Sequence, residues 1–255
     1  MTTEAAELKN TVWPSVSSVV NYFCMKRVPT PELLDTDAGT PAEIAGSLAD
    51  LRRVNGWFGG VNTTQAMVAH IARTTGRADL SLLEVAAGSS EVPERVRARL
   101  SRRGINLRIT LLDRAHSHLQ NSNDAVVADA LALPFTDGSF DLVSSCLFAH
   151  HLSPDALQQF TREALRTCRI AVLVNDLIRH PIHLALIYAG YPLYSSRLTR
   201  HDAPASVRQA YTPDEMKDIL TQAGSAQIEL KRHYLFRMGA IAWKCKLDLL
   251  SSEAR

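Results

Sequence analysis

The sequence predicts an α/β fold with a doubly wound, mostly parallel seven-stranded sheet, an N-terminal helical cover and an inserted helical lid segment. Short apolar segments alternate with helical patterns along residues 80–175, an alternation typical of a parallel sheet with helices on both faces. Acidic residues stand at three predicted strand ends, Glu84, Asp113 and Asp129. Ligands of open parallel sheets bind at such strand ends.

The expected domain organisation is simple. A helical cap should cover residues 1–62, and one domain should extend over residues 63–255 with an insertion at about 176–211. Prolines interrupt the chain after a helical pattern at residues 12–26. A second helix should begin at Thr40-Pro41-Ala42-Glu43, a capping box with proline at the first helical position, and should end at Gly59-Gly60. This helical region should lie over the ligand edge of the sheet.

The remaining elements follow in order. The first strand is followed by a helix that ends at Gly104, and each later strand again precedes a turn or helix. Within the insertion, a helix should precede an irregular segment, and a second capping box at Thr212 should open the last helix. The predicted strands are 80–86, 106–113, 123–128, 140–146, 169–175, 226–232 and 234–243, and the predicted helices include 93–103, 154–167, 182–189 and 212–224.

The composition excludes several classes of protein. The chain is 46% hydrophobic and 21% charged, with a net charge of +2 and no long basic run, which argues against a nucleic-acid partner. No apolar run reaches the length of a membrane span, and the N-terminus lacks a signal core. The four cysteines form no close pair, so neither a disulfide framework nor a metal site is expected. We therefore expect a cytoplasmic protein without a membrane span or a metal, and a homodimer stays open.

The turn after the first strand suggests a nucleoside. Residues 84–90 read EVAAGSS, and small residues let the backbone approach a ligand closely. Asp113 could accept hydrogen bonds from ribose hydroxyls, and Asp129 lies where a purine ring would sit. A dinucleotide oxidoreductase is disfavoured, because residues 86–91 do not form G-x-G-x-x-G.

These segments together resemble the class I S-adenosylmethionine (SAM)-dependent methyltransferases, which have a Rossmann-like fold. The first motif of that family is acid-x-G-x-G-x-G, and the matching positions here are Glu84, Ala86, Gly88 and Ser90. Only the middle glycine is kept. The string LPFTDGSFDLVSSCLFAHHL at residues 133–152 resembles the fourth motif, and the resemblance covers roughly residues 80–243.

The resemblance implies SAM as the cofactor and S-adenosylhomocysteine (SAH) as the product. Gly88 would lie near the carboxylate end, Asp113 on the ribose diol and Asp129 on the adenine amino group. Leu131 would press on the adenine face, and Asn55, Trp57 and Phe58 could close over the methionine end. The predicted cofactor-binding residues are Glu84, Ala86, Gly88, Ser89, Asp113, Arg114, Asp129, Ala130, Leu131 and Cys146.

A hydroxyl acceptor becomes more nucleophilic when a base removes its proton, and histidine suits this task near neutral pH. The predicted catalytic residues are His150, His151 and His201; alternatively, the first two only cap the next helix or pack. The predicted substrate-binding residues are Asp176, Tyr188, Arg200 and Arg208. The two arginines could instead pair with Asp202 and Asp214 on the surface.

The sequence thus predicts methyl transfer to a small-molecule acceptor, a hydroxyl of an aromatic or polyketide-like metabolite of secondary metabolism. Three alternatives stay open. One is C-methylation of a quinone-type precursor. Another is methylation of protein or nucleic acid, disfavoured because no basic tract is present. The third is a non-catalytic SAM-binding protein, which the missing glycines at positions 86 and 90 suggest.

Overall fold

The structure is a computed structural model that describes residues 25–36, 38–88, 90–114, 119 and 124–246 of the chain. Most of the helix predicted at residues 12–26, and Ser89 of the predicted cofactor set, lie outside the described residues. Within the described part, no helix combines the length and the apolar character needed to cross a bilayer.

The core is one seven-stranded sheet in the order β3-β2-β1-β4-β5-β7-β6. The first five strands are parallel, whereas β7 pairs antiparallel with both β5 and β6. Central strands are buried on both faces, which explains their continuous apolar runs. The predicted fold class is therefore confirmed. The strands are β1 Asp79–Val85, β2 Asn106–Asp113, β3 Ala125–Val127, β4 Phe140–Cys146, β5 Cys168–Leu177, β6 Gln227–His233 and β7 Arg237–Trp243.

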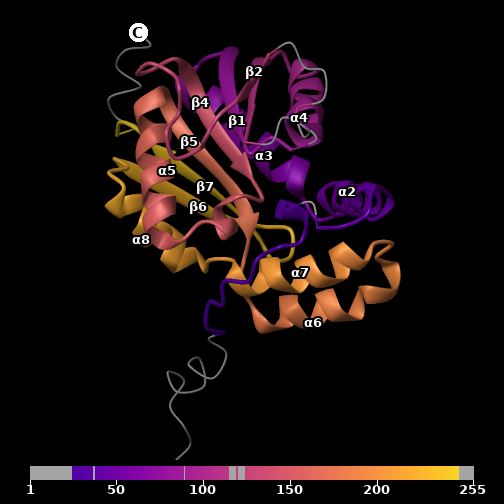
Figure 1. Ribbon diagram of the computed structural model, residues 1–255. Helices are drawn as coiled ribbons and strands as arrows, with labels where there is room; N and C mark the ends of the chain where they lie inside the picture. Colours follow the sequence, from indigo (N-terminus) through magenta and orange to yellow (C-terminus); the bar gives the residue numbers. More distant parts are fainter. Residues whose placement is uncertain (1–24, 37, 89, 115–118, 120–123, 247–255) are drawn as a thin grey trace, which may run out of the picture.

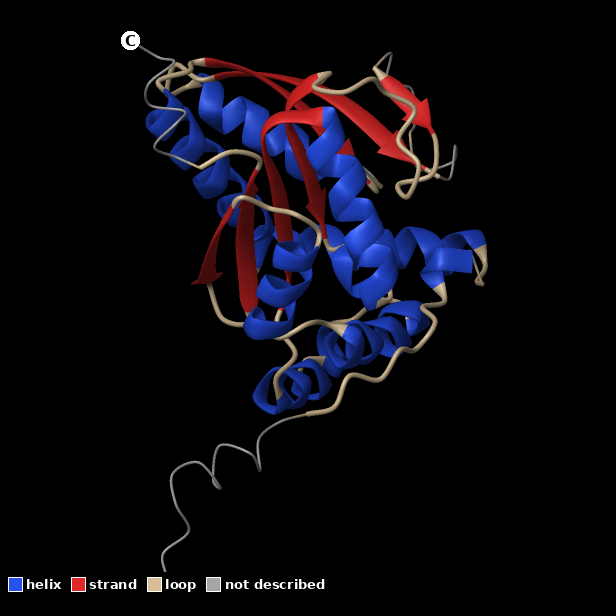
Figure 2. Cartoon of the chain, turned by 90° about the vertical axis from the view of Figure 1, so that its left-hand side faces the viewer, coloured by secondary structure: helices blue, strands red, loops and turns tan. Residues whose placement is uncertain are grey.

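Helices cover both faces of this sheet (Figure 2). One core cluster joins apolar residues of α3 and α4 to one face, and a second joins α5 and α8 to the other. The α-helices are α2 Pro41–Trp57, α3 Gly60–Thr75, α4 Glu91–Ser101, α5 Pro154–Thr167, α6 Pro181–Ala189, α7 Arg197–Gln209 and α8 Pro213–Gln222, with short 3₁₀ turns η1 Leu34–Thr36, η3 Ala149–His151 and η4 Tyr191–Leu193.

Helices α2, α6 and α7 gather beyond the carboxyl ends of the parallel strands (Figure 1). Both predicted capping boxes are confirmed, Thr40 with Glu43 at the start of α2 and Thr212 with Glu215 at the start of α8. The segment before η1 is hydrogen-bonded to α7: the Val28 N–H donates to the Arg208 carbonyl at 3.0 Å. The ligand edge of the sheet thus has a cover built from two separate parts of the chain.

Two elements differ from the sequence prediction. Helix α3 is absent from the sequence prediction, because Gly59-Gly60 is typical of a helix end; Gly59 has φ of 80° and the next helix begins directly after it. The predicted boundary between residues 62 and 63 falls within this helix. The irregular segment expected after residue 197 is wrong, because it is the helix α7. Pro204 cannot donate a helical hydrogen bond, but burial of Leu198 and Val207 stabilises the helix.

Candidate functional site

The loop after β1 keeps a left-handed backbone at all three positions where the resemblance would place glycine. The φ angles are 55° at Ala86, 50° at Gly88 and 56° at Ser90. Side chains other than glycine make this conformation costly, by about 1–2 kcal/mol per residue. The loop therefore retains the shape of a glycine-rich turn although two of its residues carry a Cβ atom.

Asp113 lies at the end of β2 and faces this loop. Its Oδ2 accepts a hydrogen bond from the Gly88 N–H at 3.0 Å, and the residue is buried. Asp129 is exposed after β3 and accepts from the Leu131 N–H at 2.9 Å, while Arg114 is exposed next to Asp113. The carboxyl ends of β1, β2 and β3 thus bring the predicted cofactor residues to one edge.

Glu84, near the end of β1, is a second buried acid of the site. It is 1% exposed, and its Oε2 has no hydrogen-bond partner among the described residues. Burial raises the pKa of Glu84 to about 7, and the Ser144 hydroxyl opposes the shift only in part. The carboxyl group is therefore close to half-protonated near neutral pH.

Glu84→Gln is expected to stabilise the protein above pH 7. The ordinary pKa of 4.5 rises to about 7 on folding, so the folded chain holds a proton that the unfolded chain loses between these values. The free energy of unfolding of the wild type should fall across this interval, by on the order of 3 kcal/mol. Urea unfolding from about pH 5 to pH 8 measures this. The two proteins should differ little at the acid end, and a pH-independent difference would contradict the assignment.

Arg237, at the start of β7, is a functional candidate that the sequence analysis missed. Its side chain is buried, and it donates to Oδ1 of Asn175 at 3.0 Å and to Oδ1 of Asn55 at 3.2 Å. It also lies 3.8 Å from Sγ of Cys146, the last residue of β4, and its Nε has no partner in the described part of the chain. Burial raises the pKa of Cys146 to about 12, so the thiol stays neutral. Because β7 runs antiparallel, its first residue reaches the carboxyl edge of the other strands.

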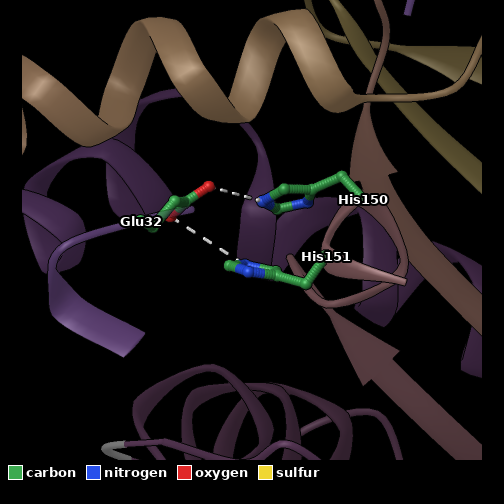
Figure 3. Close-up of side chains that lie close together, drawn as sticks. All are labelled: Glu32, His150 and His151. Carbon is green, nitrogen blue, oxygen red and sulfur yellow. Dashed lines mark ion pairs between the residues drawn. The ribbon is translucent and has the colours of Figure 1, made fainter. Parts of the chain in front are cut away.

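Two histidines and one glutamate meet beyond β4 (Figure 3). His150 and His151 lie on η3, and Glu32 comes from the segment before η1. Nε2 of His150 is 3.5 Å from Oε1 of Glu32, and Nε2 of His151 is 3.9 Å from Oε2. The other ring nitrogens face aspartates, His150 Nδ1 at 2.7 Å from Asp176 and His151 Nδ1 at 2.9 Å from Asp35. No sequence motif points to Glu32, which is far from the histidines along the chain.

The cluster is electrostatically coupled. Burial alone would lower the pKa of His150, but the carboxylates of Asp176 and Glu32 raise it to about 10. Burial opposes ionisation of both carboxyl groups. His150 and His151 nevertheless hold the pKa of Glu32 below its ordinary value, and His150 with two backbone N–H groups does the same for the pKa of Asp176. His150 is 2% exposed, whereas the side chain of His151 is 22% exposed. His151 is thus the more accessible of the two rings.

The remaining predicted residues lie on the helical cover. Nδ1 of His201 lies 2.8 Å from Oδ1 of Asp202, a buried residue that also accepts from the Leu33 and Leu34 N–H groups. Asp202 therefore anchors the segment that carries Glu32. Arg208 donates to the Tyr188 hydroxyl at 2.6 Å, and Arg200 donates to the Tyr194 carbonyl at 3.1 Å. These partners are tyrosines and not Asp202 or Asp214, the alternative surface partners of the two arginines.

Comparisons with known proteins agree with this arrangement. Residues 83–171 match the family model of a methyltransferase domain, and a comparison with curated protein sequences finds no match. The chain is similar to the structure of the plantazolicin methyltransferase BpumL in complex with SAH, with a TM-score of 0.64 and 12% identity over 84% of this chain and 95% of that one. It is also similar to the plantazolicin methyltransferase BamL in complex with a triazolic desmethylPZN analog and SAH, with a TM-score of 0.57 and 10% identity over 75% and 88%.

At these identities the solved structures establish the fold, while the family match covers the strands and loops of the cofactor edge. The structure agrees with this family match. It has the strand order β3-β2-β1-β4-β5-β7-β6, and the acid at the end of β2 contacts the loop after β1. The chain therefore contains a SAM-dependent methyltransferase domain.

Proposed function

We propose that this protein transfers the methyl group of SAM to a hydroxyl of a small aromatic or polyketide-like metabolite. The proposal rests on one observation: the predicted cofactor residues and the histidine pair lie at the same edge of the sheet. The predicted cofactor residues follow β1, β2 and β3, and the histidine pair follows β4. Methyl transfer is an in-line displacement in which alignment of the two substrates contributes most of the rate.

The cofactor would lie across the loop after β1. Asp113 would hold the ribose hydroxyls, with Asp129 and Leu131 at the adenine. The sulfonium would then point toward β4, because Cys146 ends that strand next to η3. This orientation directs the reactive methyl group toward the histidine pair.

The acceptor would bind between η3 and the helices α6 and α7. Asp176 orients His150, and Tyr188 with Arg208 supplies an aromatic and cationic wall on the cover. His151 is the accessible member of the pair, and His201 on α7 is the third candidate for proton removal. His183 is a poor base, because burial lowers its pKa to about 4 and its ring stacks on Phe236.

A small-molecule acceptor agrees with the similar structure of BpumL, whose complex contains a monoazolic desmethylPZN analog. A C-methyltransferase of a quinone-type precursor is the second candidate, because the same edge would serve an enolic carbon. A non-catalytic SAM-binding protein is disfavoured. The missing glycines at residues 86 and 90 suggested it, but the backbone is left-handed at both positions all the same.

The first test is isothermal titration of the purified protein with SAM and SAH. Micromolar binding of both supports the cofactor assignment and justifies a screen of phenols and quinols with methyl-labelled SAM. Labelled product analysed by NMR distinguishes O-methyl from C-methyl transfer. Binding without transfer to any acceptor would favour the non-catalytic alternative, and failure of both ligands to bind would contradict the proposal.

Arg237→Met is expected to weaken SAH binding by roughly 10- to 100-fold, the range for loss of a hydrogen bond to a charged group. We place the methionine carboxylate at Arg237 because its buried guanidinium lies beside Asn55 and Cys146. Titration with 5′-methylthioadenosine, which lacks this carboxylate, provides the control. Its affinity should be the same in the wild type and the variant. Equal losses for both ligands would mean that Arg237 only supports the fold.

A further inference from the structure

We propose that Glu32, His150 and His151 form a binding site for one divalent transition-metal ion of the zinc type. Their candidate ligand atoms all lie within 4.8 Å of one another, the one such group among the described residues. Two imidazole nitrogens and one carboxylate oxygen are a common zinc ligand set that leaves a coordination position open. In a tetrahedral site with bonds of about 2.0–2.1 Å, neighbouring ligand atoms stand roughly 3.3 Å apart.

The distances in the cluster are close to that requirement. Nε2 of His150 and Oε1 of Glu32 are 3.5 Å apart, and Nε2 of His151 and Oε2 of Glu32 are 3.9 Å apart. All three ligand atoms lie within 4.8 Å of one another, so rotations of the Glu32 carboxylate and the His151 ring would bring them around a common centre. Figure 3 shows the carboxylate facing both rings.

The groups around the cluster match those that surround metal ligands. Metal-binding histidines almost always use the second ring nitrogen to contact a carboxylate or carbonyl, which fixes the ring. Here Nδ1 of His150 contacts Asp176 at 2.7 Å and Nδ1 of His151 contacts Asp35 at 2.9 Å. Both Nε2 atoms are thereby directed toward Glu32.

The carboxylate is held in the same manner. Oε1 of Glu32 accepts from the Ser206 hydroxyl at 2.6 Å and from the Gln209 amide at 2.8 Å, both on α7. Oε2 is left facing His151. The pair of His70 and Glu229, at 3.0 Å, differs in having no third potential ligand among the described residues.

The sequence offered no metal motif, because Glu32 and the histidine pair are brought together only by the path of the chain over the sheet. The open coordination position of a bound ion would face the space between η3 and the helices α6 and α7, where we place the acceptor. Hydroxyl and enol oxygens bound to such an ion lose their proton more easily. This use of the ion rests on the proposed function, whereas the binding site itself does not.

The test uses full-length protein without an affinity tag, first freed of metal with a chelator. Equilibrium dialysis with Zn²⁺ measures stoichiometry and affinity, and the visible spectrum of the Co²⁺ form reports coordination by nitrogen and oxygen. We expect one ion per chain and an affinity loss of at least about 100-fold in Glu32→Gln and His151→Gln. Asp176→Asn, which removes a supporting group, should lose roughly 10- to 100-fold.

His70→Gln is the matched control and should bind Zn²⁺ as the wild type does. Circular dichroism of each metal-free variant verifies the fold; His151→Gln, at a partly exposed position, serves if Glu32→Gln does not fold. Equal Zn²⁺ affinity in wild type and His151→Gln would overturn the proposal. Methyl transfer that survives chelation, together with no Zn²⁺ binding, would overturn it while leaving the proposed function standing. Zn²⁺ binding without any methyl transfer would support the site and count against the proposed function.

Discussion

Asp113→Ala is expected to weaken binding of both SAM and SAH by roughly 100- to 10,000-fold. Two hydrogen bonds from the ribose hydroxyls to a carboxylate would be lost, and each hydrogen bond to a charged group contributes about 1.5–3 kcal/mol. The same substitution removes the acceptor of the Gly88 N–H, so the loop after β1 would keep its Ala87–Leu112 backbone hydrogen bond to β2 but lose the one to the Asp113 side chain. Isothermal titration of both ligands measures the loss.

A matched control is Asp218→Ala, at an exposed position on α8 away from the sheet edge. It should bind both ligands as the wild type does. Titration with 5′-methylthioadenosine separates this prediction from that for Arg237, because the ribose is present in that ligand and its affinity should fall in Asp113→Ala. Unchanged affinity for SAM in Asp113→Ala would remove the ribose assignment.

His151→Gln is expected to lower kcat by about 100- to 10,000-fold, the range for loss of a group that assists proton removal. The ring stands directly after β4 and is the accessible member of the pair. Its ring nitrogens face Asp35 and Glu32 rather than the predicted cofactor residues, so the SAM affinity should stay as in the wild type. Single-turnover methyl transfer to an acceptor found in the screen gives the rate, and titration gives the affinity.

The matching control is His70→Gln, which removes a histidine on α3 that pairs with Glu229 of β6. It should retain both kcat and SAM affinity. The assignment would fail if His151→Gln kept its kcat and raised only KM, since that result describes a binding contact. A fall in SAM affinity would instead mean that η3 supports the cofactor.

Much of the fold could be predicted because its signals are local. The capping box at Thr40 and Glu43 requires only four neighbouring residues. The strand ends at Glu84 and Asp113 follow segments rich in leucine, which are typical of buried strands. Alternating strands and helices then restrict the topology to a few arrangements. Local patterns of this kind were enough to predict where β1 and β2 end.

The rest of the site depends on contacts between distant segments. Arg237 lies in an ordinary-looking strand, and its importance appears only when β7 is placed antiparallel beside β5. Helix α7 contains Pro204, and its stability comes from buried contacts with other elements. Glu32 has no local motif at all, and it joins the histidines because Asp202 fixes the neighbouring backbone.

The path of the chain also has a consequence for biosynthesis. Glu32 is supplied near the beginning of the chain, whereas Arg237 and β7 are supplied near its end. Pairings between such distant segments form late in folding, because the loop between them must close first. A nascent polypeptide on the ribosome would thus have β1 and β2 in place long before Arg237 is supplied. Arg237 would reach the carboxyl edge of the sheet only when β7 inserts between β5 and β6.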